Sequence, residues 1–533
     1  DNSTIVRFVP PDDISFINIE PFQKGSYFKS QTEGSAVSGN LMIAYAKVIG
    51  KHQFNANLRG DIATSKNSFT SFEAVGFPFG TNGNPVFSYS YKPTSRPASS
   101  AITSRSAGGL VSANYAYDQR FLIDATYRLD GSSVFGSNKQ FQPFLSGGIG
   151  WNISRERFMQ HITWINMLKL RANAGYTGNQ NLGSFTSTSV YTYFSGANTF
   201  GQGLDMTSLG NPNLDWQTTL QKSYGLDFTF LNNRVSGSLE YFDKLTSPMI
   251  VTASGTIPSS AGVNTYSLNI GELRTTGYAF NVRVSPVYNL AKRIVWTIGV
   301  SGQANKSTYG GFGANLKELN DLQLTNNSLV RFSDGNSPDD IWAVLSRGID
   351  PATGSEIFQK KNGVYTFVYS TDDIVKVGNS RPKVEGIINT SVTYKNFTFG
   401  ANLRYRIGGN IFNSALYQKV ENISANSLYQ NQDKRALYNR WQKPGDIAEF
   451  KAISLVTTTP MSSRFVQKDN HVVGESINAG WRVSNGWIRK LKLQSLSFNV
   501  YVNEIFRIES VQTERGIDYP FARSASFSLN ANF

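Results

Sequence analysis

Few residues in this 533-residue sequence have the types and spacing that catalysis or metal binding requires. Cysteine is absent, which excludes disulfides, thiol nucleophiles and cysteine-based metal sites. The histidines, His52, His161 and His471, are far apart in the sequence, so we expect no histidine metal site. The carboxylates are dispersed, and no pair has surroundings that would separate two pKa values for acid–base work. The sequence therefore predicts neither an enzyme nor a bound cofactor.

Aromatic and arginine side chains are the remaining residues that could contact a cargo. Aromatic rings in two polar stretches could stack on sugar rings or on peptide side chains, although packing between loops would explain them equally well. These substrate-binding candidates are Tyr89, Tyr91, Tyr191, Tyr193 and Phe194. The arginines of interest alternate with apolar residues, and they are Arg128, Arg171, Arg404 and Arg406.

Each of these arginines lies in a segment with period-two alternation, which is typical of a strand with two different faces. In residues 397–407 the apolar side chains alternate with polar ones, and Arg404 and Arg406 fall on the polar side. Residues 121–130, 168–176 and 525–533 repeat the pattern. We count roughly fifteen such segments, most near the ~10 residues with which a tilted strand crosses a bilayer. The arginines are therefore expected to face a water-filled lumen, and Phe533 to mark the end of the last strand.

Composition narrows the class of protein further. Mean hydropathy is −0.29, aromatic residues make up 13% of the chain, and no run of roughly 18 apolar residues occurs, so a transmembrane helix is not expected. A membrane protein of this kind would have to be a β-barrel. The net charge of +14 comes from scattered lysines and arginines without a basic run of five, which argues against nucleic-acid binding. A soluble all-β enzyme or binding protein remains as an alternative.

The connections between the predicted strands alternate between short and long. Short links are expected at residues 117–120, 231–234, 288–293, 395–396 and 484–489, and long links at residues 64–107, 178–213, 409–470 and 504–519. This alternation is typical of outer-membrane barrels, which have short periplasmic turns and long external loops. The sequence therefore predicts an all-β, antiparallel transmembrane barrel with outer-membrane lipid as its surroundings.

The order of several local motifs is similar to that of one known family. The motifs are "DGSSVFG" from Asp130, "LSGGIGWNIS" from Leu145, "LKLRANAGYTGNQNLG" from Leu168, "NPNLDWQTT" from Asn211, "NIGELRTTG" from Asn269 and "SSRFV" from Ser462. Together with the terminal strand they resemble the SusC/RagA family of TonB-dependent outer-membrane transporters of Bacteroidetes. The resemblance runs from about Leu41 to Phe533.

The resemblance implies a multi-pass barrel in the cell outer membrane, with 22 strands and an N-terminal plug. It also implies a SusD-like surface lipoprotein as a lid, energy from TonB acting through the plug, and import of oligosaccharides or peptides. The alternative within the membrane class is a barrel that serves as a scaffold for assembly, adhesion or secretion. The choice between glycan and peptide cargo stays open.

The sequence departs from that picture at its beginning. Residues 1–40 show little alternation and contain Pro10-Pro11, so we expect an external loop or a fragment start with little regular structure there. Residues 41–533 are expected to form the C-terminal part of the barrel, about 15 of the family's strands. The plug and the earlier strands would lie outside this chain. Residues 41–50 and 522–533 should then be the edges that the N-terminal remainder of the barrel completes.

Overall fold

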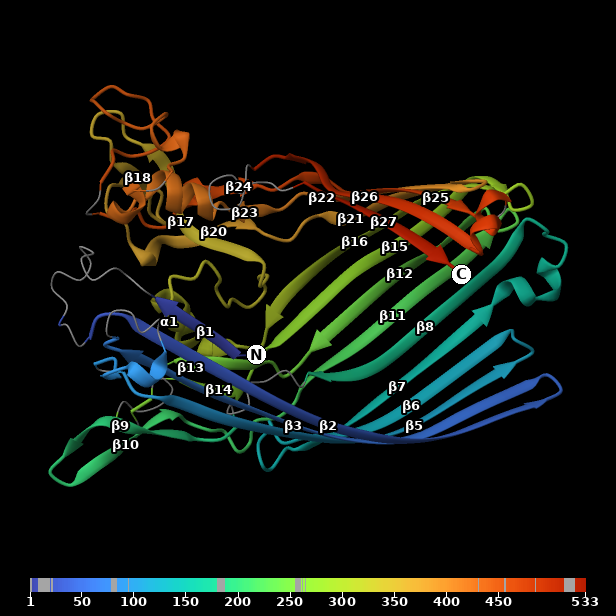
Figure 1. Ribbon diagram of the computed structural model, residues 1–533, viewed down its shortest axis with the longest axis horizontal. Coiled ribbons are helices and arrows are strands. Elements are labelled where there is room, and N and C mark those ends of the chain that lie inside the picture. Colours follow the sequence, from blue (N-terminus) through green and yellow to red (C-terminus); the bar gives the residue numbers. More distant parts are fainter. Residues whose placement is uncertain are drawn as a thin grey trace.

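The structure is a computed structural model of the chain, and it is dominated by β-strands (Figure 1). It describes residues 2–7, 20, 23–77, 84–93, 95–179, 187–254, 260, 262–263, 265–429, 431–454, 457–484, 486–511 and 523–533.

A 17-stranded antiparallel sheet forms a curved wall of tilted strands (Figure 1). Its strands are β1 (Asn2–Arg7), β2 (Ser26–Ile49), β3 (His52–Val75), β4 (Ser90–Tyr91), β5 (Ala98–Tyr117), β6 (Phe121–Ser132), β7 (Phe141–Asn152), β8 (Ile165–Asn179), β11 (Gln217–Phe230), β12 (Val235–Thr246), β15 (Glu272–Asn289), β16 (Ile294–Gly310), β21 (Val384–Tyr394), β22 (Phe397–Ile407), β25 (His471–Val483), β26 (Ser495–Glu509) and β27 (Ser524–Asn532). The long strands pair with their neighbours in chain order, and β1 and β4 pair with the ends of β2 and β3. The predicted all-β antiparallel fold is confirmed.

The alternating segments coincide with strands of this wall. Residues 397–407 form β22, residues 121–130 lie in β6, residues 168–176 lie in β8, and most of residues 525–533 form β27. Side chains that alternate in polarity suit a sheet whose faces meet different surroundings, because successive residues of a strand point to opposite faces.

Strands β2 and β3 differ from the expected lengths. Each contains 24 residues, and their register is unbroken from the pair Ser26–Val75 to the pair Ile49–His52. The expectation of little regular structure in residues 1–40 is therefore wrong for residues 26–40, and β1 also falls in that segment. Small polar residues on both faces hide the alternation there, while the backbone ladder with β3 still holds the strand. Since ~10 residues cross a bilayer, these strands continue well beyond one.

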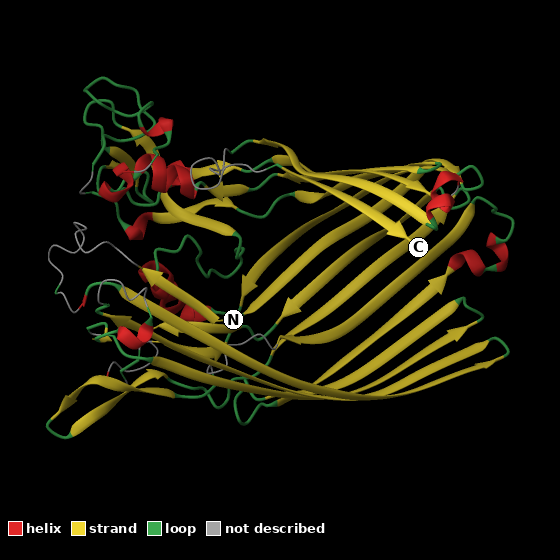
Figure 2. Ribbon diagram, in the orientation of Figure 1, coloured by secondary structure: helices red, strands yellow, loops and turns green. Residues whose placement is uncertain are grey.

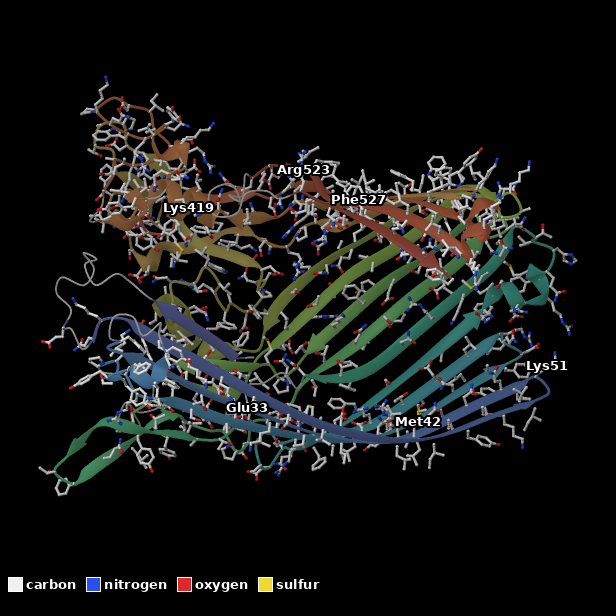
Figure 3. The ribbon with its side chains drawn as sticks, in the orientation of Figure 1. Glu33, Met42, Lys51, Lys419, Arg523 and Phe527 are labelled. Atoms are coloured by element: carbon white, nitrogen blue, oxygen red, sulfur yellow. The ribbon has the colours of Figure 1, made fainter. Side chains whose placement is uncertain are left out.

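Short and long connections separate to opposite ends of the wall, as the sequence predicted. The short turns join β2 to β3, β5 to β6, β11 to β12, β15 to β16 and β21 to β22. In Figure 3, Lys51 lies in one of these turns, and Lys419 lies at the opposite end among the long connections. We call these the short-turn end and the long-loop end.

The long connections contain most of the remaining elements. These elements are β9 (Val190–Asn198), β10 (Gly201–Ser208), β13 (Ile250–Ser254), β14 (Thr265–Asn269), β17 (Asp340–Ile349), β18 (Glu356–Gln359), β19 (Tyr365–Thr366), β20 (Ile374–Asn379), β23 (Asn410–Phe412), β24 (Val466–Lys468), the helix α1 (Leu316–Thr325), the π-helix Leu416–Glu421 and the short 3-10 helices Pro85–Phe87, Gly313–Asn315, Thr371–Asp373, Ala425–Tyr429, Lys434–Ala436 and Ser463–Phe465. At the short-turn end, Ile153–Arg155, Arg157–Met159 and Gly486–Leu491 are short helices (Figure 2). In the described part of the chain, no helix has both the length and the apolar character needed to cross a bilayer.

The apolar core lies at the long-loop end, where the connections fold against one another. One cluster joins Tyr309, Phe312 and Leu319 with strand β13, and another surrounds Phe465. Along the rest of the wall, large apolar side chains are exposed instead. The wall therefore has no covering layer of its own among the described residues.

The two outer edges of the wall do not pair with each other. Among the described residues, β27 pairs only with β26, and residues 32–49 of β2 pair only with β3. Completion of these edges by a further part of the barrel stays a prediction.

Candidate functional site

The wall has one apolar face and one polar face. Residues paired directly across antiparallel strands share a face, so a face can be followed from strand to strand. On β6, Ile123 lies on the apolar face and is 51% exposed, whereas Asp124 and Arg128 lie on the opposite face. On β27, Phe527 belongs to the apolar face and is 69% exposed, and the serines between the apolar residues point the other way.

Exposure on the apolar face is too extensive for a surface in water. Leu41, Ile62, Ile123, Ile149 and Phe527 are all more than half exposed. Full burial of one such side chain is worth about 1.5–3 kcal/mol, so a whole row of them requires apolar surroundings.

The polar face is lined by ion pairs between strands, and Arg128 belongs to one of them. Its Nη2 lies 3.2 Å from Asp61 Oδ2 on β3, and its Nε lies 2.6 Å from Asp130 Oδ1. A Cβ at Gly108 would lie only 2.8 Å from Arg128 Nη2. Glycine at this position therefore leaves room for the guanidinium of Arg128. The guanidinium is therefore held flat against the wall.

Arg171 is held in the same way on β8. Its Nη2 lies 2.7 Å from Glu240 Oε2, and its Nε lies 3.4 Å from Asp227 Oδ2. Gly225 is its direct partner on β11, and a Cβ at Gly225 would lie 2.5 Å from Arg171 Cζ. Glycine at this position leaves room for the side chain to lie across the neighbouring strand.

Arg404 and Arg406 lie on the polar face of β22 and pair with acids of the following connection and strand. Arg404 Nη2 lies 2.5 Å from Glu475 Oε1, at the irregularity in β25 where the register shifts. Arg406 Nε lies 3.4 Å from Asp469 Oδ2, and its Nη2 donates to the carbonyl of Ser380 (2.6 Å). All four of these arginines therefore lie on the polar face of the wall, and each forms an ion pair with a nearby carboxylate.

The aromatic candidates lie on separate elements. Tyr91, in β4, meets the edge of Phe72 with ring centroids 6.0 Å apart, and Tyr89 is exposed just before it. Tyr191 and Tyr193 are exposed on β9, which pairs only with β10 among the described strands. The side chain of Phe194 lies outside the described residues. Phe533 follows β27 and is exposed. No described contact joins the β4 pair to the β9 pair in one site.

Three of the sequence motifs meet at the edge of the long-loop end. Phe135, from "DGSSVFG", stacks on Trp216, from "NPNLDWQTT", with ring centroids 4.0 Å apart. Gly136 is needed there, because a Cβ would lie 2.1 Å from the carbonyl oxygen of Pro212. Asn269, which opens "NIGELRTTG", exchanges two 2.8 Å hydrogen bonds with the backbone of Asp215. The motifs therefore fix how the long connections leave the wall.

A buried ionic cluster that sequence reasoning did not predict joins the two longest connections. Arg464 Nη2 lies 3.0 Å from Glu356 Oε2 and 2.7 Å from Glu421 Oε1. Ser462 donates to Glu356 Oε1 (2.5 Å). Burial lowers the pKa of Arg464, but the hydrogen bonds to Glu421 and Glu356 and the negative charges of these carboxylates together outweigh burial and raise the pKa above its usual value. The motif "SSRFV" contains Ser462 and Arg464, so it is the feature of the sequence that could have pointed to this cluster.

The comparisons with known proteins agree with this architecture. A family model described as TonB dependent receptor-like, beta-barrel matches residues 18–501. The TonB-dependent receptor SusC of Bacteroides thetaiotaomicron is 24% identical over 523 residues, which cover 92% of this chain and 49% of that protein. A TonB-dependent receptor of Formosa agariphila is 25% identical over 444 residues, which cover 74% and 41%.

Solved structures show the same fold. The RagAB peptide transporter superposes with a TM-score of 0.81 at 17% identity, over 95% of this chain and 56% of that one. The chain spans about half the length of the curated relatives it matches. The resemblance to SusC and RagA is confirmed, and the chain belongs to the TonB-dependent receptor-like β-barrel family of the outer membrane.

Proposed function

We propose that this chain forms the C-terminal wall of an outer-membrane importer of large nutrients, either oligosaccharides or peptides, powered by TonB. The observation that carries the proposal is the two-faced wall, with an exposed apolar face and a polar face lined by Arg128, Arg171, Arg404 and Arg406. Lipid covers the first face in this account, and the second lines a wet lumen. The family to which the chain belongs supports the membrane placement.

In this proposal, the parts of the chain and its partners have separate roles. Strands β2 to β27 supply the barrel wall, the segments between them supply the long external loops, and the remainder of the barrel completes the edges at β2 and β27. A plug outside this chain couples the barrel to TonB, and a SusD-like lipoprotein covers the long-loop end. RagAB, a peptide transporter with this fold, supports transport rather than a scaffold role.

Cargo is proposed to meet the exposed aromatic rings at the long-loop end. Tyr89, Tyr91, Tyr191 and Tyr193 present flat apolar surfaces there, which suit sugar rings and peptide side chains alike. Tyr89 and Tyr91 lie in and just before β4, and Tyr191 and Tyr193 lie on β9, so each pair contacts a different part of an extended cargo in this proposal.

Disruption of the gene tests the proposed function directly. Cells that lack the protein should lose growth on one class of large nutrient, and labelled oligosaccharides or peptides should no longer enter. Affinity purification of the tagged protein should recover a surface lipoprotein. Unchanged uptake of every oligosaccharide and peptide tested, with loss of surface adhesion or secretion instead, would favour the scaffold alternative.

A further inference from the structure

The turns at the short-turn end contain many more basic than acidic residues. The basic residues with described side chains are Lys51, Arg120, Arg155, Arg157, Arg234, Lys292, Arg293, Lys395, Lys490 and Lys492. The acidic residues of the same turns are Asp118 and Glu156. An excess of positive charge therefore lies at the short-turn end of the folded wall.

Backbone hydrogen bonds join several of these turns to a neighbouring turn. The amide of Asp118 donates to the carbonyl of Lys51 (2.7 Å), and the amide of Leu231 donates to that of Trp164 (2.7 Å). The amide of Lys395 donates to the carbonyl of Arg293 (2.8 Å). The spacing of the charges is consequently fixed by the wall rather than by mobile loops.

Three neighbouring turns at the short-turn end carry basic side chains that form no ion pair with a described acidic side chain. Arg234, Lys292, Arg293 and Lys395, which we call the basic arc, lie in three successive turns and are exposed. Within the described residues, no acidic side chain forms an ion pair with any of them. By contrast, Lys51 and Arg120 both pair with Asp118, at 3.1 and 3.3 Å.

Exposed apolar side chains border the basic arc on the side of the wall. Tyr394 and Phe397 flank the turn of Lys395, and Leu231 and Leu290 occupy the other two turns. Lys395 Nζ lies 5.5 Å from the centroid of the Tyr394 ring. Positive charge next to rings and aliphatic groups suits the layer where acyl chains meet phosphates.

We propose that the basic arc binds the phosphates of anionic phospholipids in the leaflet that the short turns face. The charges follow a curved edge instead of lining a pocket, and the apolar border continues into the exposed apolar face of the wall. A bilayer leaflet matches both features at once. This inference rests on the membrane placement proposed above.

The test compares lipid binding to the complete barrel that contains this chain, purified in detergent, by native mass spectrometry. The probes are phosphatidylglycerol, which is anionic, and phosphatidylcholine, which has no net charge. The arc variant carries Arg234→Gln, Lys292→Gln, Arg293→Gln and Lys395→Gln. We expect it to bind phosphatidylglycerol at least about tenfold more weakly than the wild type, since each basic residue near an anionic surface contributes to attraction. Binding of phosphatidylcholine should not change.

Two matched variants serve as controls. Lys317→Gln, Lys360→Gln, Lys361→Gln and Lys443→Gln together remove the same charge from the long-loop end and should leave phosphatidylglycerol binding unchanged. Exchange of lysine and arginine within the basic arc, with Arg234→Lys, Lys292→Arg, Arg293→Lys and Lys395→Arg, should retain binding. Equal phosphatidylglycerol affinity in the arc variant and the wild type would overturn the inference, as would an equal loss in the long-loop control.

Two further measurements distinguish lipid binding from a folding defect and from binding of a protein. The heat-modifiable gel shift of the barrel shows whether the arc variant is folded. If the arc variant is not folded, the double variant Lys292→Gln, Lys395→Gln is used in its place. Loss of an acidic protein partner from the arc variant, with lipid affinity intact, would assign the arc to a protein instead. If the wild type dissolved without detergent, the membrane placement itself would fail, independently of the lipid preference.

Discussion

Neighbouring residues of β22 should lose stability to very different extents when their polarity is exchanged. Leu403 lies on the apolar face, and an arginine on a lipid-facing position near mid-bilayer costs about 2–4 kcal/mol. Arg404 is 58% exposed and pairs with Glu475, so its loss should cost at most about 1 kcal/mol. We therefore expect Leu403→Arg to lower the urea midpoint of unfolding in lipid vesicles far more than Arg404→Leu. Equal losses would contradict the assignment of faces.

A side chain at a glycine beneath a flat arginine should displace that arginine. Gly225→Ala would place a methyl group 2.5 Å from Arg171 Cζ and displace the guanidinium from Glu240. We expect a loss of up to about 1 kcal/mol in the free energy of unfolding, because the flexible guanidinium can move aside but then leaves its ion pair with Glu240. Gly109→Ala is the matched control, because nothing lies within 4 Å of a Cβ there. An equal effect of both variants would show that Gly225 has no such spatial role.

At the scale of elements, the buried Arg464 cluster should hold the two longest connections together. Arg464→Met leaves Glu356 and Glu421 buried without their partner, which costs about 3–5 kcal/mol in comparable sites. We expect proteases to cut residues 408–470 rapidly in this variant, while the gel shift of the barrel stays unchanged. Arg347→Met, which removes an exposed arginine of β17, is the control and should leave the proteolysis pattern intact. Identical digestion of both variants would refute the role of the cluster.

The individual strands and the buried cluster show which parts of this fold can be predicted from the sequence alone. Strands such as β6 and β22 were predictable, because their two faces contrast sharply in polarity. The outer halves of β2 and β3 were not, since Ser, Thr, Asn and Gly occupy both faces and only backbone pairing reveals the strands. The cluster of Glu356, Glu421 and Arg464 was also hidden, because its residues are distant in sequence and each looks like a surface charge.

For the whole molecule, the burial pattern is inverted relative to a protein in water. The described core lies in the long connections, while the wall exposes apolar residues on one face and ion pairs on the other. Lipid outside and water inside satisfy both faces together, and neither solvent alone does. We therefore propose that the wall crosses the outer membrane, with the short-turn end in the periplasm.

Single cysteines at the two ends test this placement most directly, because these 533 residues contain no cysteine. Asn232→Cys lies in the turn between β11 and β12, and Ser427→Cys lies in the connection between β22 and β25. On intact cells, a membrane-impermeant maleimide should label the cysteine at Ser427 and leave that at Asn232 unlabelled, and lysed cells should label both. Labelling of the Asn232 position on intact cells would contradict the account.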